Sequence, residues 1–396
     1  MSESRIYLDN HSTTRVDPTV VEAMLPYLTE NYGNPGSTHR FGEEARAAID
    51  CGREVIAHSV NASASEIVFT SGATESNNLA IRGVAAKYAD RGNHVVTVST
   101  EHPAVLDPVE RLQKLPKFDA TVFPVCADAK RSRGEIDLDR LADAIRDETI
   151  LVSVMFANNE IGIIHPIQEI AKLCRDRGAL LHCDATQAVG RIVVDVRELD
   201  VDLMSFSAHK IYGPRGVGAL FVRRRPRVKI EPQIDGGGQQ MGRRSGTQNT
   251  PGIVGFAKAI QLATDHLETE AKRIRSLRDH LWERLSNEIP NVHLNGPTLN
   301  APASHRLPGN LNVQFEGVDA ESLMLQIPDI AVSTGSACTA ENPEPSHVLL
   351  AIGCTEDEAR SSIRFGIGRF NTLDEIDTVA NRMAIAVKKL RELGAA

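Results

Sequence analysis

The sequence lacks any long apolar run. No stretch approaches the roughly 20 consecutive apolar residues needed to cross a bilayer, which excludes a helical membrane span. The opening residues 1–5 also lack the apolar centre of a secretion signal, so we expect a cytoplasmic protein. A hydrophobic content of 41% is ordinary for a globular chain, and 396 residues are enough for more than one domain.

Paired cysteines and a positive charge balance are absent as well. The six cysteines show no C-x-x-C spacing, which argues against a zinc knuckle and against a disulfide framework. They are Cys51, Cys126, Cys174, Cys183, Cys338 and Cys354, and we expect most of them to be buried thiols. The formal net charge of −8 argues against general nucleic-acid binding. We therefore expect the basic run at residues 223–229 to be a solvated or subunit-facing loop rather than a nucleic-acid patch.

What the sequence does contain is a repeated alternation of apolar and helical segments. The short apolar runs, typical of buried strands, are residues 95–98, 121–125, 150–156, 179–183 and 201–206. This pattern predicts a buried, mostly parallel sheet. Ligands of such sheets bind beyond the carboxyl ends of the strands. Polar residues collect at those ends: Thr74, His102, Asn159, Asp184, Gln187, Ser207, His209 and Lys210.

A lysine at one strand end is the clearest indication of chemistry. Lys210 follows the run 201–206, and Ser207 and His209 lie beside it in the sequence. A lysine amine held against a carbonyl compound, with phosphate-binding groups nearby, is what pyridoxal phosphate (PLP) requires. Residues 71–78 are mostly small and polar and open a helix after a strand, which suits a phosphate site. The alternatives, a solvated surface lysine and a well-capped turn, are not excluded by these stretches alone.

The last third of the chain predicts a smaller α+β portion. Residues 310–315 and 361–367 have strand patterns, and helical segments lie between and after them. Small and turn-forming residues surround a single cysteine, Cys338, at about 333–346. Because this segment lacks apolar anchors, we expect a mobile, exposed loop with a reactive thiol. The alternative is an incidental free thiol.

Taken together, these motifs resemble those of the PLP-dependent cysteine desulfurases of the NifS/IscS-like type, within the class V aminotransferase-like family. The likeness covers nearly the whole chain and rests on residues 7–10, 72–76, 101–102, 158–160, 184–187, 207–210, 244–247, 335–339 and 363–365. It implies an α/β protein of PLP-dependent transferase fold type I. A large PLP-binding domain with a mostly parallel seven-stranded sheet would span residues 15–260. A small domain carrying the catalytic loop would combine residues 1–14 and 261–396.

The resemblance also implies a cofactor role for each motif. Lys210 would be the Schiff-base lysine, Asp184 the partner of the pyridine nitrogen, and His102 the acid/base on the ring face. Gln187 would reach the ring hydroxyl oxygen, and Asn159 would be a further cofactor contact. The phosphate would be bound by Ala73, Thr74, Ser207, His209 and, from the other subunit of a homodimer, Thr247.

The implied substrate is L-cysteine. Arg364 would clamp its carboxylate, a task that suits the bidentate geometry of a guanidinium, and Asn10 and Asn159 would lie beside it. The alternative for Arg364 is a surface ion pair.

The implied reaction yields L-alanine and a persulfide. The freed Lys210 would remove the Cα proton, and the Cys338 thiolate would attack the substrate sulfur with His102 as acid/base. The persulfide would pass its sulfur to an acceptor protein, an iron–sulfur scaffold or a sulfur carrier. The pathways implied are iron–sulfur cluster assembly and the thiolation of cofactors or tRNA. No metal site is expected, although Cys338 could transiently bind an iron–sulfur cluster.

Two other functions stay open. A related PLP lyase acting on selenocysteine, cysteine or cystine would need no protein thiol. A non-catalytic sulfur-relay partner on the same fold would be expected to have lost at least one of Lys210, Asp184, His102 and Cys338. The chain also departs from the family, which usually has a small residue before Thr13, where this chain has His11 and Ser12.

Overall fold

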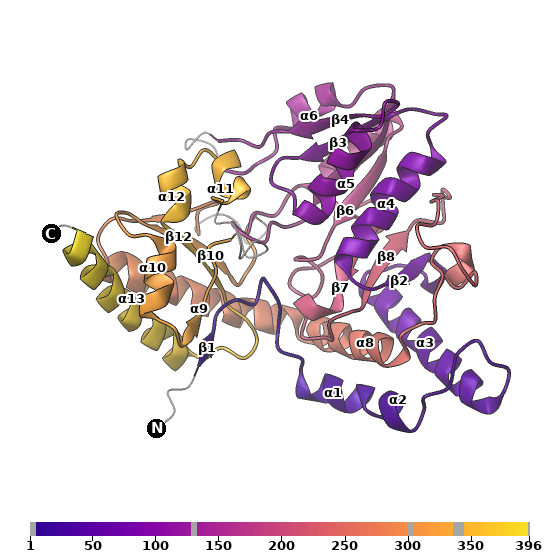
Figure 1. The fold of residues 1–396 in the computed structure, drawn as a ribbon, viewed down its shortest axis with the longest axis horizontal. Helices are drawn as coiled ribbons and strands as arrows, with labels where there is room; N and C mark the ends of the chain where they lie inside the picture. The colour runs from indigo at the N-terminus through magenta and orange to yellow at the C-terminus, as the bar shows by residue number, and fades with distance from the viewer. Residues whose placement is uncertain (1–4, 128–132, 300–304, 336–343, 395–396) are drawn as a thin grey trace.

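The computed structural model describes residues 5–127, 133–299, 305–335 and 344–394. Two parts lie side by side in these ranges, a larger one built on a seven-stranded sheet and a smaller one built on a three-stranded sheet (Figure 1). No helix of the described ranges has the length and apolar character needed to cross a membrane.

The large sheet is mixed but mostly parallel. Its strands are β2 (Ile67–Thr70), β3 (His94–Val98), β4 (Asp119–Phe123), β5 (Thr149–Met155), β6 (Leu180–Asp184), β7 (Leu203–Ser207) and β8 (Gly218–Val222). They follow the order β2-β8-β7-β6-β5-β3-β4. Only β8 among them runs antiparallel to its neighbours. The predicted mostly parallel, seven-stranded sheet is thereby confirmed.

Helices cover both faces of the large sheet, which explains why its strands are continuous apolar runs. The helices are α3 (Arg40–Ser59), α4 (Ala73–Lys87), α5 (Pro103–Gln113), α6 (Leu138–Ala144), α7 (Ile167–Arg177) and α8 (Thr250–Asp265). Successive strand residues point to opposite faces. Val68 therefore shares an apolar cluster with α4 and α5, while the next residue, Phe69, belongs to the cluster that includes α3, α7 and α8. Two short helices, α1 (Pro18–Met24) and α2 (Pro26–Thr29), pack against α8.

The smaller part has an apolar core of its own. Its antiparallel sheet has the order β12-β10-β9. The elements are α9 (Leu267–Glu288), β9 (Val292–Leu294), β10 (Asn310–Phe315), α10 (Ala320–Gln326), α11 (His347–Ala351), α12 (Glu356–Arg360), β12 (Ser362–Gly366) and α13 (Leu373–Gly394). Leu281, Phe315 and Met383 belong to one buried cluster that is distinct from the two clusters at the large sheet.

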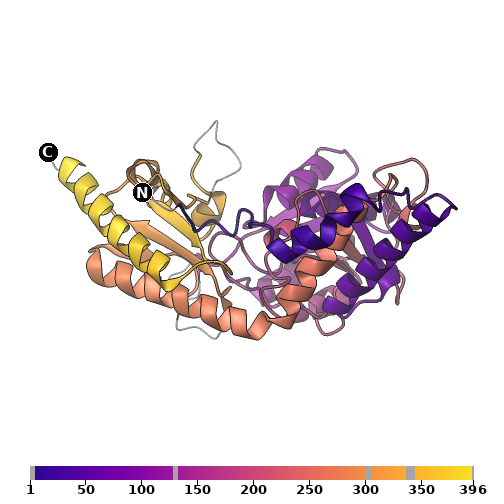
Figure 2. The same ribbon diagram turned by 90° about the horizontal axis from the view of Figure 1, so that it is seen from below.

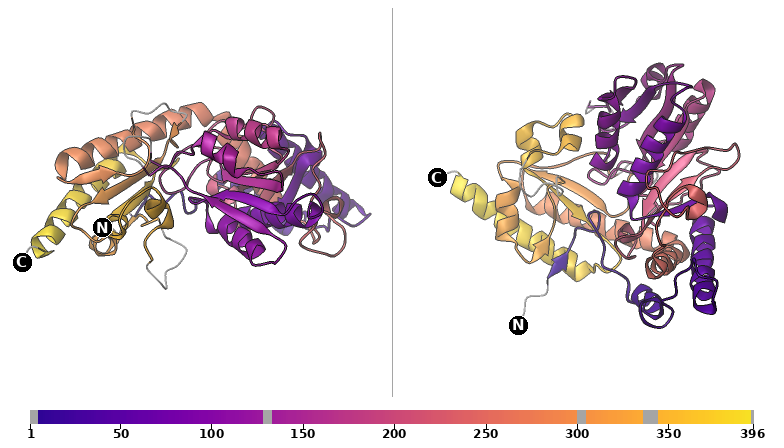
Figure 3. Two further views of the ribbon diagram at one scale, coloured as in Figure 1. Left: turned by 90° about the horizontal axis from the view of Figure 1, so that it is seen from above. Right: turned by 45° about the vertical axis from the view of Figure 1, so that its right-hand side comes forward.

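Two segments connect the parts. The helices α8 and α9 follow each other along one side of the molecule, with His266 between them (Figure 2). The strand β1 (Ile6–Tyr7) pairs in parallel with β11 (Ile330–Ala331) of the small part, and the chain then runs to α1 at the large part (Figure 3). We propose that the parts are separate domains. Because the predicted boundary after residue 260 falls inside α8, we place the division at His266.

This topology brings the turns after five strands to one edge of the large sheet. The strands β2, β3, β5, β6 and β7 run in the same direction, so their carboxyl ends meet at that edge. The small part contributes Arg364 of β12 to the same place. The fold therefore brings the residues that follow the strands of the large part close to the guanidinium of Arg364 from the small part.

Candidate active site

A cavity of about 790 Å³ lies at this edge of the sheet, a size typical of a site for a cofactor or small molecule. The predicted residues that line it are Ala73, Thr74, His102, Asn159, Asp184, Gln187, Ser207, His209, Lys210 and Arg364. A larger cavity of about 1370 Å³ lies in the small part beside Trp282, and none of the predicted site residues that the structure describes lines it. The convergence of strand-end residues marks the smaller cavity as the candidate active site.

Lys210 ends a short helical turn (Ala208–Lys210) that follows β7. Its Nζ donates hydrogen bonds to the backbone carbonyls of His11 (2.7 Å) and Ser12 (2.6 Å). Burial, and after it the positive charges of Arg191 and Arg364, lowers the pKa of this amine to about 7. Such an amine is substantially unprotonated at neutral pH and can act as a nucleophile or a base. The solvated surface lysine that the sequence left open is therefore not what the structure shows.

Asp184 is the last residue of β6 and is buried. Its Oδ1 accepts a hydrogen bond from the backbone N–H of Thr186 (2.9 Å), and its Oδ2 accepts one from the side-chain amide of Asn77 (2.7 Å). Both donors are neutral, so they orient the carboxylate without cancelling its charge. This arrangement suits a ligand that brings a positive charge of its own. Asn77, on α4, was not predicted.

His102 caps the start of α5 and lines the cavity. Its Nδ1 accepts a hydrogen bond from the backbone N–H of Ala104 (3.0 Å). The neutral ring must then carry its proton on Nε2. Burial lowers the pKa of His102, although the negative charge of Asp184 opposes this shift. The histidine is therefore neutral at physiological pH, and Nε2 is the nitrogen that can exchange a proton with a ligand.

The first turn of α4 and the end of β7 form a polar end of the cavity. Ala73 and Thr74 begin α4, where the backbone N–H groups lack intrahelical partners and the helix dipole is positive. Ser207 and His209 line the cavity from the end of β7. Burial and the charge of Lys210 lower the pKa of His209 to about 4. These neutral donors suit an anion such as a phosphate.

Gln187 is held by two buried side chains that the motifs did not reveal. Its Oε1 accepts a hydrogen bond from Arg191 (2.7 Å) and lies 2.9 Å from His11 Nδ1, while its Nε2 donates to the carbonyl of His11 (2.9 Å). Arg191 also donates to the carbonyls of Asn10 (2.6 Å) and Lys210 (3.0 Å). This network fixes which end of the Gln187 amide faces each neighbour. The four-residue spacing of Gln187 and Arg191 is the feature of the sequence that could have predicted the contact between these two side chains.

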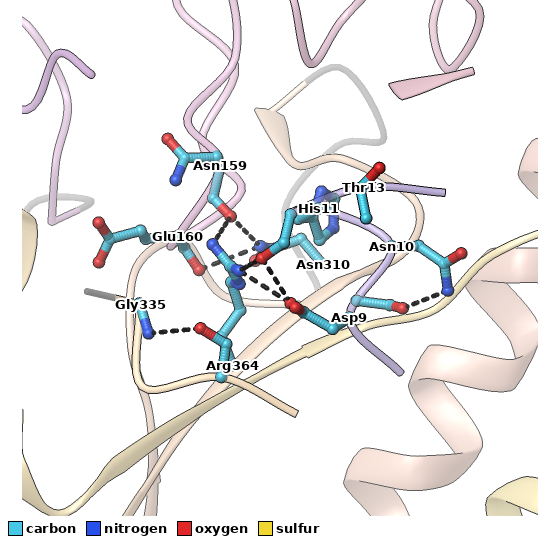
Figure 4. A network of polar contacts seen from close by, with 12 residues as sticks. Asp9, Asn10, His11, Thr13, Asn159, Glu160, Asn310, Gly335 and Arg364 are labelled. Atoms are coloured by element: carbon cyan, nitrogen blue, oxygen red, sulfur yellow. Dashed lines mark hydrogen bonds and ion pairs between the residues drawn. The ribbon is translucent and has the colours of Figure 1, made fainter. Parts of the chain in front are cut away.

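Arg364 lies in the middle of β12 and is only 2% exposed. One terminal nitrogen donates to Asp9 Oδ1 (2.9 Å) and to Ser12 Oγ (2.6 Å), and the other donates to the carbonyl of Asn159 (3.3 Å). Its Nε has no hydrogen-bond partner among the described residues. Figure 4 shows this network around the guanidinium. The ion pair with Asp9 is buried, unlike the surface pair that the sequence left open.

The remaining predicted residues are placed differently. Asn10 does not line the cavity: its side-chain amide donates to the carbonyl of Gly366 (2.8 Å) and to Asn371 Oδ1 (3.3 Å). Thr247 is exposed and also lies away from the cavity of its own chain. Cys338 lies in residues 336–343, outside the described residues. The described residues on both sides of that range, Gly335 and residues 344–347, do line the cavity.

The five described cysteines are free thiols. Cys174, Cys183 and Cys354 are buried, as predicted for most of the cysteines, whereas Cys126 is half-buried and Cys51 is exposed. Burial raises the pKa of Cys174 to about 12 and also raises the pKa of Cys183 and of Cys354. These three thiols therefore stay protonated and unreactive at neutral pH.

The residues of the cavity fit PLP, the cofactor that the sequence resemblance implies. A lysine amine of pKa about 7 suits its aldehyde, and the oriented carboxylate of Asp184 suits its pyridine nitrogen. The start of α4, with Ser207 and His209, suits its phosphate.

Several known proteins resemble this chain over nearly its whole length. Residues 6–379 match the family described as aminotransferase class-V. The chain is 51% identical over 389 residues to "Cysteine desulfurase IscS" of Anaeromyxobacter sp. strain Fw109-5, covering 98% of this chain and 94% of the relative. The protein of the same name from Methylobacillus flagellatus is 50% identical over 390 residues, with 98% and 93% covered. A solved structure titled "NifS-like protein" superposes with a TM-score of 0.88 at 36% identity, covering 97% of this chain and 100% of that one.

A second solved structure, of DndA from Streptomyces lividans, has a TM-score of 0.75 at 35% identity, with 90% of this chain and 98% of that chain covered. The family match spans far more than half of the chain, and the curated relatives cover nearly all of it. The chain belongs to the PLP-using aminotransferase class-V family, as its motifs predict.

Proposed function

The chain is a PLP-dependent cysteine desulfurase, and we propose that Lys210, His102 and Cys338 are its catalytic residues. In the reaction the carbon–sulfur bond of L-cysteine breaks, a sulfur–sulfur bond forms at Cys338, and L-alanine leaves. The observation that carries the assignment is the near-neutral amine of Lys210 in one cavity with Asp184 and His102.

Lys210 acts as the base at the substrate Cα. Bound PLP supplies the electron sink that stabilises the negative charge left on that carbon. With a pKa of about 7, the Lys210 amine can take up a proton and release it again near neutral pH. Its described hydrogen bonds go to two backbone carbonyls, which hold the amine in the cavity wall and carry no full negative charge that would keep it protonated.

His102 moves protons at the substrate sulfur. The bond from the Ala104 amide fixes the ring through Nδ1, so Nε2 exchanges the proton. Burial keeps the pKa of His102 low enough for the neutral ring to be the resting form.

Arg364 binds the substrate carboxylate, and Asn159 lies beside it. The guanidinium is already oriented by Asp9, Ser12 and the Asn159 carbonyl, and Arg364 lines the cavity. Because a preoriented cation loses little freedom on binding, it favours a single pose of the amino acid. Asn10 supports this site indirectly, since its amide anchors residues 9–12 to β12 through Gly366.

Cys338 is the sulfur-accepting nucleophile. A chain spans at most about 3.6 Å per residue, so three residues allow a reach of about 11 Å from Gly335, which lines the cavity. The thiolate attacks the substrate sulfur, and the sulfur leaves as the persulfide. Each turnover must then return Cys338 to a thiol, which requires an acceptor. We propose an acceptor protein, an iron–sulfur scaffold or sulfur carrier.

The active form is proposed to be a homodimer. Large apolar side chains of α1, α2 and the start of α3 are exposed: Val21 49%, Leu25 55%, Leu28 60%, Tyr32 71% and Phe41 51%. A cluster of this kind usually marks a protein interface. The exposed Thr247 is available to the phosphate site of a second subunit. Its loop is held by Arg244, which pairs through two bonds with Glu75 of α4 (2.8 and 3.1 Å).

The lowered pKa of Lys210 predicts how the apoprotein takes up PLP. Only the neutral amine attacks the aldehyde, so the uptake rate should rise about tenfold per pH unit below pH 7 and level off above about pH 8. A lysine with the usual pKa of 10.5 would give a rise that continues past pH 10. Stopped-flow absorbance of PLP measures the rate, and a tenfold rise between pH 8 and pH 9 would contradict the assignment.

Replacing the nucleophile separates desulfuration from simple lyase chemistry. Cys338→Ser should keep the PLP absorbance and lose alanine and persulfide formation by roughly 10³-fold or more. Cys51→Ser, which alters the exposed thiol of α3, should keep full activity. Mass spectrometry of the trapped persulfide and an alanine assay provide the readouts. If Cys338→Ser released sulfur at the normal rate, the protein would be a lyase.

The dimer is tested by placing a charge in the exposed apolar cluster. Wild-type protein should have twice the chain mass of 43.1 kDa, and Leu28→Asp should shift it to the single-chain mass and weaken PLP binding. Leu325→Asp, at an equally apolar side chain of α10 that is 78% exposed, is the matched control and should leave the dimer intact. Sedimentation equilibrium measures the mass, and a monomeric wild type would overturn the proposal.

A further inference from the structure

Glu160 is a buried carboxylate in the turn after β5, directly beside Asn159. The residue is 4% exposed. Its backbone N–H donates to Asn158 Oδ1 (2.8 Å), and its carbonyl accepts from Asn310 (3.0 Å) and Asn312 (3.2 Å) of β10. The backbone of Glu160 is therefore fixed by both parts of the molecule at once.

The Glu160 side chain reaches Ser346, three residues beyond the end of residues 336–343. Its Oε2 accepts a hydrogen bond from the hydroxyl of Ser346. The Ser346 oxygen in turn accepts from the backbone N–H of Leu349 (3.2 Å) and caps α11. Because the amide of Leu349 uses an acceptor lone pair, the hydroxyl proton of Ser346 is free for Glu160. The carboxylate thus ties the start of α11 to the end of β5.

The same carboxylate packs on the residue that precedes the segment. Gly335 has φ +95°, and a Cβ added there would lie 2.4 Å from Glu160 Oε2. The backbone of Gly335 is further held by a bond from its N–H to Ser333 Oγ (3.1 Å). Figure 4 shows Glu160 and Gly335 close together beside Asn159 and Arg364. One oxygen atom therefore contacts the chain on both sides of residues 336–343, at Gly335 and at Ser346.

We propose that Glu160 is a positioning residue for Cys338. By bonding Ser346 and packing on Gly335, it fixes both attachment points of the segment that carries the nucleophile, relative to Asn159 and the cofactor site. The inference rests on the proposed role of Cys338 in sulfur transfer. A misplacement of about 1 Å can cost about 10²-fold in rate, and Cys338 is only three residues from Gly335.

The test compares binding with sulfur transfer in the holoenzyme. Glu160→Ala should slow single-turnover persulfide formation by 10- to 100-fold, with the PLP absorbance and the spectral response to L-cysteine unchanged. Glu160→Gln, whose amide oxygen can still accept from Ser346, should recover most of the rate, and Ser346→Ala should slow it as well. Glu358→Ala is the control, since Glu358 is a carboxylate that supports the start of another short helix, α12, by accepting from Thr355 N–H (2.7 Å).

A second comparison uses the close contact at Gly335. Gly335→Ala should slow persulfide formation strongly in the wild type, because its Cβ meets the carboxylate. It should cost clearly less in the Glu160→Ala background, where that carboxylate is gone. Additive effects of the two substitutions would contradict the contact between Gly335 and Glu160. Any cost that remains in the Glu160→Ala background reflects the strain of alanine at φ +95°.

Several outcomes would overturn the proposal. Persulfide formation at the wild-type rate in Glu160→Ala would refute the positioning role and leave the proposed function intact. Loss of PLP binding in Glu160→Ala together with a normal rate in Ser346→Ala would show that Glu160 is only structural. A Cys338→Ser variant that still transferred sulfur would instead overturn the proposed function itself.

Discussion

Desolvation of the Lys210 amine is the constraint around which the site is built. The amine is enclosed beside two other cations, Arg191 and Arg364, and its described hydrogen bonds go to the backbone carbonyls of His11 and Ser12. A carboxylate in their place would stabilise the charged form and raise the pKa of the amine. The neighbouring cations are satisfied separately, Arg191 largely by carbonyl oxygens and Arg364 by Asp9. Among the described residues, the hydrogen bonds of Lys210 go to carbonyls, and the negative charges of Asp9 and Asp184 offset the lowering of its pKa only in part.

The N-terminal segment is what makes this balance possible. Residues 9–14 cross from the small part to the large part, and almost every one of them contacts the site. The carbonyls of His11 and Ser12 hold Lys210, Ser12 Oγ holds Arg364, and the Thr13 hydroxyl lies 3.1 Å from His209 Nδ1. A segment that begins in β1 therefore links Lys210 of the large part to Arg364 of the small part. The segment contacts Lys210 through the backbone carbonyls of residues 11 and 12, whereas it contacts Arg364 through the side chains of Asp9 and Ser12.

The sequence predicted the site residues best where they follow strands of a parallel sheet. His102, Asp184 and Lys210 follow apolar runs, and the carboxyl ends of parallel strands meet at one edge, so their convergence was predictable. The order of the strands and the antiparallel insertion of β8 were not, because strand pairing joins residues far apart in the chain. Asn77 and Asp184 illustrate the same limit, since the partners of this bond are 107 positions apart.

Side-chain direction was also beyond the sequence. Asn10 lies next to the motif that holds the site, but its amide turns to Gly366 and Asn371. The position in the chain gives no information about which side of the backbone faces a cavity. Glu160 shows the converse, since a residue next to the predicted Asn159 contacts the distant residues Gly335 and Ser346, which lie on either side of residues 336–343.

The depressed pKa of Lys210 has a consequence for the lifetime of the protein. The pKa of the Lys210 amine falls from 10.5 in the unfolded chain to about 7 in the folded apoprotein. Near neutral pH this shift destabilises the folded apoprotein relative to the unfolded chain by about 5 kcal/mol. The proposed bond between this amine and PLP would remove that penalty, and ligand binding to the native state adds stability of its own. The cofactor then acts as a folding ligand as well as a reagent. Chains without it are the ones that unfold and are degraded first, so cofactor supply would govern how much of the protein a cell keeps.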